Sequence, residues 1–157
     1  MSKLKHQNFD KLLKYLPKSK IKAGDGKKSG KYRFFKSGAD QSKFIDAANY
    51  QGESLIIGDG GTANINHYEG SFSTSDHCYV IQKNIDDIDT KYVYYFLKSN
   101  LHILEAGFKG AGLKNISKKY ISNIQIPLLP LVEQQKIALF LTQIEYIANC
   151  LSLSASC

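Results

Sequence analysis

Residues 54–82 read SLIIGDGGTANINHYEGSFSTSDHCYVIQ, and this stretch decides the fold class of the chain. Three short segments within it are apolar or alternate between two faces, which is typical of strands: SLIIG (54–58), ANINHY (63–68) and HCYVIQ (77–82). The segments GDGG (58–61) and EGSFSTS (69–75) separate them as turn regions. The pattern therefore predicts a compact antiparallel unit of short strands and glycine turns.

The nearest strand signal upstream is KYRFFK, residues 31–36. Because side chains alternate along a strand, Tyr32 and Phe34 should lie on the face opposite Arg33 and Phe35. The segment adds a strand of aromatic character to the predicted unit.

Helical periodicity appears on both sides of the strands. A first predicted helix ends at Pro17 and has one apolar face, made of Phe9, Leu12, Leu13 and Leu16. A second is capped by Thr90, ends at Gly107 and has a longer apolar face: Val93, Phe96, Leu97, Leu101 and Leu104. A short helix or turn at 117–122 leads to the strand-like NIQIPLL (123–129). The predicted fold class is α/β (α+β), with short, mostly antiparallel strands and flanking helices.

The chain leaves this unit through IPLLPLVEQQKIALFL, residues 126–141. Pro127 and Pro130 forbid a helix through their own region, and an amphipathic helix follows them. Its apolar residues have the spacing of a heptad seam, which Phe140 and Ile147 widen on one flank: Ile137, Leu141, Ile144, Ala148 and Leu151. This segment is either the last helix of the globule or a projecting helix that binds a partner. The two prolines favour the second interpretation.

Length and composition predict one folded domain without export. The 157 residues are 43% hydrophobic, which is enough for a real core. No uninterrupted apolar run approaches a membrane span of roughly 18 residues, and the lysine-rich start does not resemble a signal peptide. We therefore expect a cytoplasmic protein with no membrane contact. The three cysteines lack metal-ligand spacing and predict reduced thiols: Cys78, Cys150 and Cys157.

The net charge of +7 is concentrated near the N-terminus. Residues 1–50 contain thirteen Lys and Arg against four Asp and Glu, whereas residues 51–100 contain three against seven. Such a local excess is either an electrostatic footprint for a polyanion such as nucleic acid or a solvated face that aids solubility.

Three loops carry side chains suited to DNA: residues 31–42, 58–66 and 107–117. Lysine and arginine neutralise phosphates, glycine lets the backbone approach them, and asparagine or glutamine can read a base edge. The candidate DNA-binding residues are Arg33, Lys36, Ser37, Gln41, Thr62, Asn64, Asn66, Lys109, Lys114 and Asn115. GDGG itself has a plainer interpretation, a tight turn that needs a positive φ.

Enzyme motifs do not stand out in the sequence. GDGG matches neither the P-loop pattern G-x-x-x-x-G-K-[ST] nor the G-x-G-x-x-G of dinucleotide folds. The three prolines are never adjacent, which excludes the [DNS]-P-P-[YFW] tetrapeptide of amino-methyltransferases, and no paired-carboxylate nuclease motif appears. The sequence predicts binding without chemistry and without a metal site.

Two other hypotheses remain open at this point. The chain could be a small nucleotide-binding enzyme whose pocket combines GDGG with Asp76, His77 and Cys78. Adjacent residues of a strand point to opposite faces, which argues against a catalytic pair of His77 and Cys78. The chain could also be a pure interaction module that binds a partner through residues 131–151.

The order of these segments resembles the target-recognition domain of type I restriction–modification specificity subunits. The resemblance covers roughly residues 10–150. Its most specific part is the string I-x-[IL]-P-x-x-P-x-x-E-Q-x-x-I, carried here by Ile124, Ile126, Pro127, Pro130, Glu133, Gln134 and Ile137. The G-x-x-x-x-x-[IL] pattern before it is matched by Gly110 and Ile116.

This resemblance implies sequence-specific recognition of double-stranded DNA by a non-catalytic specificity (S) subunit, or half of one. Such a subunit directs separate methyltransferase and restriction (endonuclease) subunits to their target. S-adenosylmethionine, ATP and magnesium would belong to those partners, with no cofactor in this chain. Residues 1–130 would form the recognition domain and 131–157 the start of a conserved spacer helix of coiled-coil type.

The chain departs from the family pattern in one respect. A complete specificity subunit resembles two such domains, and their two long helices pack antiparallel as a ruler between the halves of a bipartite site. Here there is one domain, and the helix ends in CLSLSASC where a long charged helix is expected. We expect either an incomplete subunit or a half-length one that forms a homodimer through the C-terminal helix, using Ile137, Leu141, Ile144 and Ala148.

Overall fold

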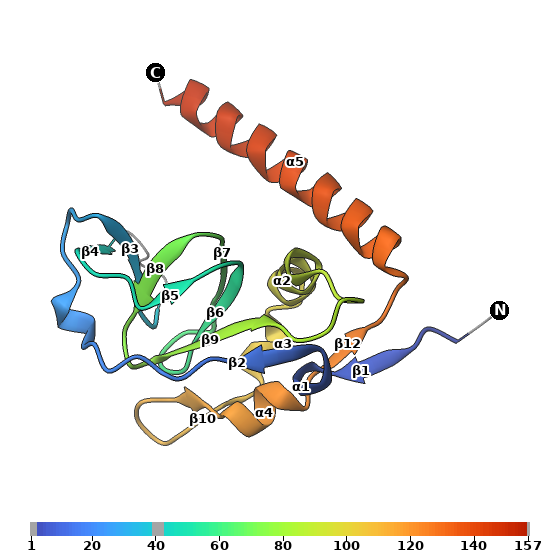
Figure 1. The fold of residues 1–157 in the computed structure, drawn as a ribbon, viewed down its shortest axis with the longest axis horizontal. Coiled ribbons are helices and arrows are strands. Elements are labelled where there is room, and N and C mark those ends of the chain that lie inside the picture. The colour runs from blue at the N-terminus through green and yellow to red at the C-terminus, as the bar shows by residue number, and fades with distance from the viewer. Residues whose placement is uncertain (1–2, 39–42, 157) are drawn as a thin grey trace.

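A computed structural model describes residues 3–38 and 43–156 and contains two four-stranded sheets (Figure 1). The first sheet is antiparallel throughout, in the order β2 (Leu13–Tyr15), β9 (Cys78–Lys83), β6 (Ser54–Gly58) and β7 (Ile65–Tyr68). Every residue of β6 is buried, as its apolar sequence predicts for a central strand. The strands predicted at 54–58, 63–68 and 77–82 are thereby confirmed to within two residues.

The second sheet has the order β4 (Lys43–Ile45), β3 (Tyr32–Phe35), β8 (Ser71–Thr74) and β5 (Tyr50–Gln51). Its β3–β8 pair is parallel, while its other two pairs are antiparallel. Strand β8 occupies the segment that the sequence analysis predicted as a turn region. The polar residues there can be buried because they find hydrogen-bond partners. Ser73 Oγ, for example, donates to Ala47 O at 2.7 Å and accepts from Asn49 N at 2.9 Å, both in the segment between β4 and β5.

Aromatic side chains fill the space between the two sheets. Phe72 is fully buried and packs against three other rings, those of Phe35, Tyr50 and Tyr68, with centroids 5.4–5.7 Å apart. Ile56 of β6 belongs to the same cluster. Phe35 therefore faces this core.

A larger core lies on the other face of the first sheet and is covered by short helices. These helices are α1 (Phe9–Leu12), α2 (Thr90–Ser99), α3 (His102–Glu105) and α4 (Lys118–Ser122), with a 3-10 turn, η1 (Ala23–Asp25), in the N-terminal loop. The sequence predicted the helix or turn at 117–122 correctly. The cap of α2 is Asp89, not Thr90, since the Asp89 carboxylate accepts from Tyr92 N at 2.7 Å.

Two helix predictions are wrong in extent. The predicted N-terminal helix to Leu16 ends at Leu12, because Leu13–Tyr15 pair with β9 and the sheet satisfies their backbone groups instead. The predicted helix from Thr90 to Gly107 is divided into α2 and α3 at Asn100, whose side-chain amide donates to Phe96 O at 2.8 Å. Tertiary pairing and a local amide contact override the helical periodicity at these positions.

Two small ribbons complete the domain. Strand β1 (His6–Asn8) pairs with β12 (Gln125–Pro127), so the two ends of the globular part lie side by side (Figure 1). Strands β10 (Phe108–Lys109) and β11 (Asn115–Ile116) form a hairpin within the glycine-rich segment that was predicted as a loop.

Helix α5 (Leu131–Ala155) starts immediately after Pro130, and its far end stands clear of the sheets (Figure 1). By length and composition alone, α5 could cross a membrane, although the sequence analysis expected no segment of that kind. One such helix is weak support for a membrane assignment, and polar contacts tie its first half to the domain.

Candidate nucleic-acid interface

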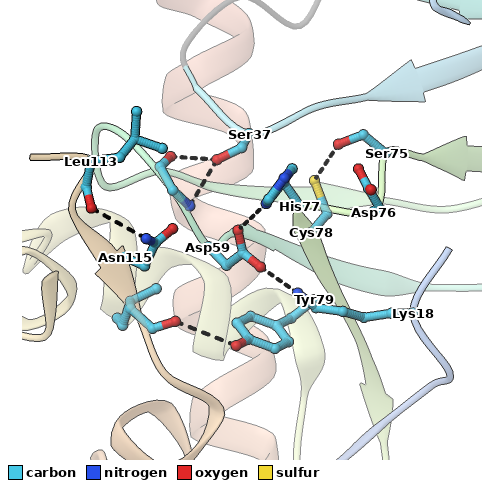
Figure 2. A network of polar contacts seen from close by, with 12 residues as sticks. Lys18, Ser37, Asp59, Ser75, Asp76, His77, Cys78, Tyr79, Leu113 and Asn115 are labelled. Carbon is cyan, nitrogen blue, oxygen red and sulfur yellow. Dashed lines mark hydrogen bonds and ion pairs between the residues drawn. The ribbon is translucent and has the colours of Figure 1, made fainter. Parts of the chain in front are cut away.

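The three loops with candidate DNA-binding residues meet at the end of strand β6. Ser37 Oγ donates to Gly60 O and accepts from Gly60 N at 3.0 Å. Gly60 also forms an isolated antiparallel bridge with Asn115, and Gly61 N donates to Lys114 O at 3.1 Å. Segments that are distant in sequence thus form one continuous edge, which Figure 2 shows from close by.

A cleft of about 240 Å³ opens at this junction. Its walls come from the η1 segment, the end of β3, the GDGG turn, the start of β9 and the β10–β11 hairpin, through Ala23, Ser37, Gly60, Gly61, Ser75, His77 and Leu113. The junction therefore presents a concave surface built from several separate parts of the chain.

Glycines make the close approach of these loops possible. Gly61 has φ +81°, which confirms the turn interpretation of GDGG. A Cβ on Gly60 would lie 3.0 Å from Asn115 Oδ1, so the Asn115 side chain would have to shift to make room for it. Gly61 is therefore required for its backbone conformation, and Gly60 for its close contact with Asn115.

The buried carboxylate of Asp59 holds the GDGG turn in place. Asp59 is only 8% exposed; its side chain forms an ion pair with Lys18, and its other oxygen lies 3.0 Å from His77 Nδ1 (Figure 2). The Asp59 backbone accepts from Ile116 N at 2.9 Å, which ties the turn to β11. The Lys18 ammonium also lies 4.3 Å from the centre of the Tyr79 ring.

Sequence reasoning missed this Lys18–Asp59–His77 network. Asp59 entered the sequence analysis only within the GDGG segment, and Lys18 only within the positive charge of residues 1–50. A buried carboxylate requires a cationic or hydrogen-bonding partner, so an aspartate within a glycine turn could have suggested such a network. The sequence alone could not identify Lys18 as that partner, because the tertiary fold decides which lysine lies beside Asp59.

The candidate residues of the GDGG and hairpin segments differ in exposure. Thr62, Lys109 and Lys114 are exposed. Asn64 is half-buried, and its amide donates to Thr62 O at 2.9 Å. Asn115 is exposed, and its amide lies 3.3 Å from Leu113 O.

Two of the remaining candidates lie on the two sheets. Asn66 is half-buried on β7, opposite Ile56. Arg33 is half-buried on β3, with its guanidinium 5.7 Å and 5.5 Å from the ring centres of Phe35 and Phe44. Lys36 is half-buried next to Ser37, and Gln41 lies outside the described residues.

The geometry contradicts a catalytic pair of His77 and Cys78. Cys78 is fully buried, and burial raises the pKa of its thiol to about 12, so it is not a nucleophile at neutral pH. The side chain of His77 is 60% exposed and turns to Asp59 instead. The hydrogen bond from Lys22 holds the pKa of Asp76 below its usual value. Within residues 3–38 and 43–156 no three His, Cys, Asp or Glu side chains gather as a metal site.

Helix α5 is clamped to the domain at its start by Gln134, which has no exposed surface. Its side-chain oxygen accepts from Asp89 N at 2.9 Å, and its amide donates to Asp87 O at 3.0 Å and Leu129 O at 2.8 Å. Gln134 therefore joins the segment before α5 to the segment before α2.

A second attachment lies three turns further along α5. Glu145 accepts from Tyr95 OH at 2.8 Å and forms an ion pair with Lys98, both on α2. Thr142 Oγ1 lies 3.2 Å from the same Tyr95 hydroxyl. Two separated contacts on one helix face fix the direction of α5 relative to the domain.

The apolar face of α5 that remains exposed differs from the seam predicted from sequence. Leu141 is half-buried and packs against the domain core, so it does not belong to the free face. Ile137, Ile144 and Ala148 are exposed as expected. Among the exposed large side chains of α5, five alternate at spacings of three and four and are called the outer seam: Ile137, Phe140, Ile144, Ile147 and Leu151.

These features define a class of protein: an α/β domain that presents loops at one edge and sends out a long helix fixed at a set angle. Comparison with known sequences gives the family. The model of the type I restriction modification DNA specificity domain matches residues 10–152, so the chain belongs to that family.

Individual relatives agree with this assignment. The chain is 29% identical over 109 residues to the MjaVIII specificity subunit of Methanocaldococcus jannaschii, covering 66% of this chain and 26% of that protein. It is 26% identical over 123 residues to the EcoDI specificity subunit of Escherichia coli, covering 78% of this chain and 27% of that protein. The chain thus spans about a quarter of the length of these relatives.

Solved structures share the fold. The S subunit from M. genitalium matches with a TM-score of 0.81 at 23% identity, covering 96% of this chain and 41% of that one. The HsdS subunit from Thermoanaerobacter tengcongensis matches with a TM-score of 0.63 at 18% identity, covering 96% and 39%. These likenesses confirm the predicted mixed α/β class with antiparallel sheets and a long C-terminal helix.

Proposed function

We propose that this chain recognises a specific sequence in double-stranded DNA, as the specificity subunit of a type I restriction–modification system or half of one. In this role it directs methyltransferase and restriction subunits to the target. The observation that carries the proposal is the meeting of Ser37, Gly60 and Asn115, which unites three polar, glycine-rich loops into one edge. Membership of the DNA specificity family supports the same role.

The charges around this edge suit a polyanion. Lys109 and Lys114 are exposed on either side of the hairpin tip, and the N-terminal third of the chain has a large excess of lysine. Lysines of this kind neutralise phosphates and fix orientation, whereas Asn64 and Asn115 have the amides that read adenine edges. The proposed DNA surface includes the other candidates of the three loops as well.

The proposed subunit performs no chemistry of its own. S-adenosylmethionine, ATP and magnesium are assigned to the methyltransferase and restriction partners. We expect the assembly in the cytoplasm, where its DNA substrate is found.

The proposed division of labour separates residues 1–130, which read DNA, from residues 131–157, which begin a spacer helix. The outer seam of α5 supports this division because it exposes apolar side chains that a second helix would cover. We propose that an equivalent helix, from a second copy or from another specificity half, packs on it as a short coiled coil.

Selection from a duplex pool with a randomised core tests the DNA proposal. We expect the 157-residue chain to enrich one sequence and to bind it with an affinity that falls by about 0.9 log unit per log unit of salt for each phosphate contacted. Lys109→Ala and Lys114→Ala should weaken binding to all duplexes and flatten the salt slope, whereas Asn115→Ala should alter base preference.

The matched control is Lys136→Ala, which removes an exposed lysine on α5 and should leave binding unchanged. A chain that enriches no sequence and binds with no dependence on salt would contradict the proposed function. Tight binding of a free nucleotide without affinity for DNA would favour the enzyme hypothesis instead.

A further inference from the structure

We propose that His77 reads a base in the major groove, accepting a hydrogen bond at Nε2 from an exocyclic amino group, adenine N6 or cytosine N4. This inference rests on the proposed function and adds a specificity-determining residue to it. His77 was not among the candidate DNA-binding residues. It lines the cleft where the three loops meet, together with Ser37, Gly60 and Leu113.

The orientation of the ring is fixed by Asp59. Nδ1 lies 3.0 Å from an Asp59 carboxylate oxygen, and an ionised carboxylate can only accept, so Nδ1 carries the proton (Figure 2). In the neutral imidazole the other nitrogen, Nε2, is then an acceptor. The Asp59 backbone N–H also donates to His77 O at 3.0 Å, which holds the two residues in register.

Asp59 is suited to this role because it is buried and neutralised. It is 8% exposed, and Lys18 pairs with its second oxygen. Near the same cleft wall, Asp76 pairs with Lys22. An unpaired carboxylate at this edge would repel phosphates, whereas these two ion pairs leave no net negative charge beside the ring.

Exposure makes Nε2 available to a ligand. The side chain of His77 is 60% exposed although its carboxylate partner is only 12% exposed. A buried anchor with an exposed tip is the arrangement that positions a side chain for readout, because the ring is held without being covered. In the major groove, only adenine and cytosine present an amino donor that such an acceptor can bind.

The chain contains a matched internal control. His67 also pairs with a carboxylate, with Nε2 2.8 Å from Glu53 Oε1, but it lies on β7 beside the Tyr94 ring, and its side chain is only 12% exposed. His67 therefore shares the chemistry of His77 but does not line the cleft. Replacing it removes an imidazole–carboxylate pair without touching the proposed reading site.

The experiment compares His77→Ala and His67→Ala with the parent chain in the same selection from a randomised duplex pool. We expect His77→Ala to lose discrimination at one A·T or G·C position by roughly 5- to 150-fold, with other positions unchanged. His67→Ala should keep the preference of the parent. Because His77 is largely exposed, its loss should leave the fold intact, which circular dichroism checks.

Three results would overturn the inference. If the parent selects a sequence and His77→Ala selects the same one with equal discrimination, His77 reads no base, and the proposed function stands. If His77→Ala weakens binding to every duplex and flattens the salt slope, His77 contacts phosphate. If the parent binds no duplex, the proposed function fails together with the inference.

Two further measurements test the positioning by Asp59: the tautomer of His77 without DNA, and the base preference of an Asp59 variant with DNA. In ¹⁵N-histidine-labelled protein, we expect the His77 ring to show protonated Nδ1 and unprotonated Nε2. Asp59→Asn keeps the shape but can donate as well as accept, so the fixed tautomer and the base preference should both weaken. A ring of the parent protein with its proton on Nε2 would contradict the assigned acceptor.

Discussion

The loop edge and helix α5 are each anchored by one buried polar side chain, but the two anchors differ in kind. Asp59 is an ion that binds the side chains of Lys18 and His77, whereas Gln134 is neutral and binds three backbone groups. Side-chain partners can shift and are partly solvated, while backbone partners belong to the fixed frame of the domain. We infer that α5 is held more rigidly than the GDGG turn.

The exposed surfaces of the loop edge and of α5 also differ, one being polar and the other apolar. The loop edge presents hydroxyls, amides and lysines, which suits a hydrated polyanion. The outer seam of α5 presents aliphatic and aromatic side chains, which suits another apolar helix. The two surfaces therefore differ both in the chemistry they expose and in the buried side chain that anchors each of them.

The largest effect should follow from placing charge on the outer seam. Ile144→Asp combined with Ile147→Asp should abolish self-association, because each buried seam residue is worth roughly 1.5–3 kcal/mol. Sedimentation velocity measures the result. Asn149→Asp is the control, since it adds one negative charge at an exposed position of α5 off the seam.

Leu141→Asp should instead destabilise the domain, since Leu141 packs on its core. If the seam double variant unfolds the whole chain and the parent is strictly monomeric, α5 belongs to the core and the spacer proposal fails. Binding of the parent to phosphatidylcholine vesicles that the double variant loses would assign the seam to lipid instead.

Loss of the Gln134 anchor should have the next largest effect. Gln134→Leu keeps the approximate volume but takes this partner away from three partly buried backbone groups, those of Asp87, Asp89 and Leu129, which should lower the free energy of unfolding by about 2–4 kcal/mol. Urea denaturation measures the change, and Gln135→Leu at the neighbouring exposed position is the control. If Gln134→Leu and Gln135→Leu were equally stable, Gln134 would not anchor α5, and the inference that α5 is held more rigidly than the GDGG turn would fail.

The smallest effect concerns the ion pair of Lys98 and Glu145. Burial alone would lower the pKa of Lys98, but hydrogen bonds to Glu145 and Tyr94 outweigh it and raise that pKa to about 12. Burial alone would raise the pKa of Glu145, but hydrogen bonds from Lys98 and Tyr95 outweigh it and hold that pKa below its usual value. Both groups are partly exposed, so the pair should contribute about 1 kcal/mol or less.

The pH dependence has a definite sign for each partner. The depressed pKa of Glu145 gives stability above its unfolded value of about 4.3, which is lost as the pH falls through the folded value. The raised pKa of Lys98 gives stability below about 10.4, which is lost as the pH rises towards 12. Urea denaturation of the parent and Glu145→Gln should therefore differ near neutral pH and converge at both extremes. A constant difference across this range would show that solvent screens the pair completely.

Local sequence determined the elements whose signals come from their own residues. Strand β6 follows from five buried residues in a row, and α5 follows from helical periodicity after Pro130. The turn at Gly61 follows from the need for a positive φ. Physical causes confined to a short segment can be read without knowing the rest of the chain.

Only the tertiary structure decided the elements that depend on distant partners. Strand β8 looked like a polar turn because the partners of Ser73 come from Ala47 and Asn49. Leu13 is in a strand and not in the predicted helix because it pairs with β9. Neither partner is visible from the local pattern.

The proposed interface likewise has features that the local sequence predicts and features that only the tertiary structure decides. The sequence by itself predicted which loops carry DNA-binding chemistry and that α5 has an apolar heptad pattern, because residue types and periodicity are local properties. The structure decided that Ser37, Gly60 and Asn115 meet, that Asp59 orients His77, and that Phe140 rather than Leu141 lies on the outer seam. Contacts between distant segments, and the choice of which helix face is covered, depend on packing of the whole chain, and no local pattern contains that information.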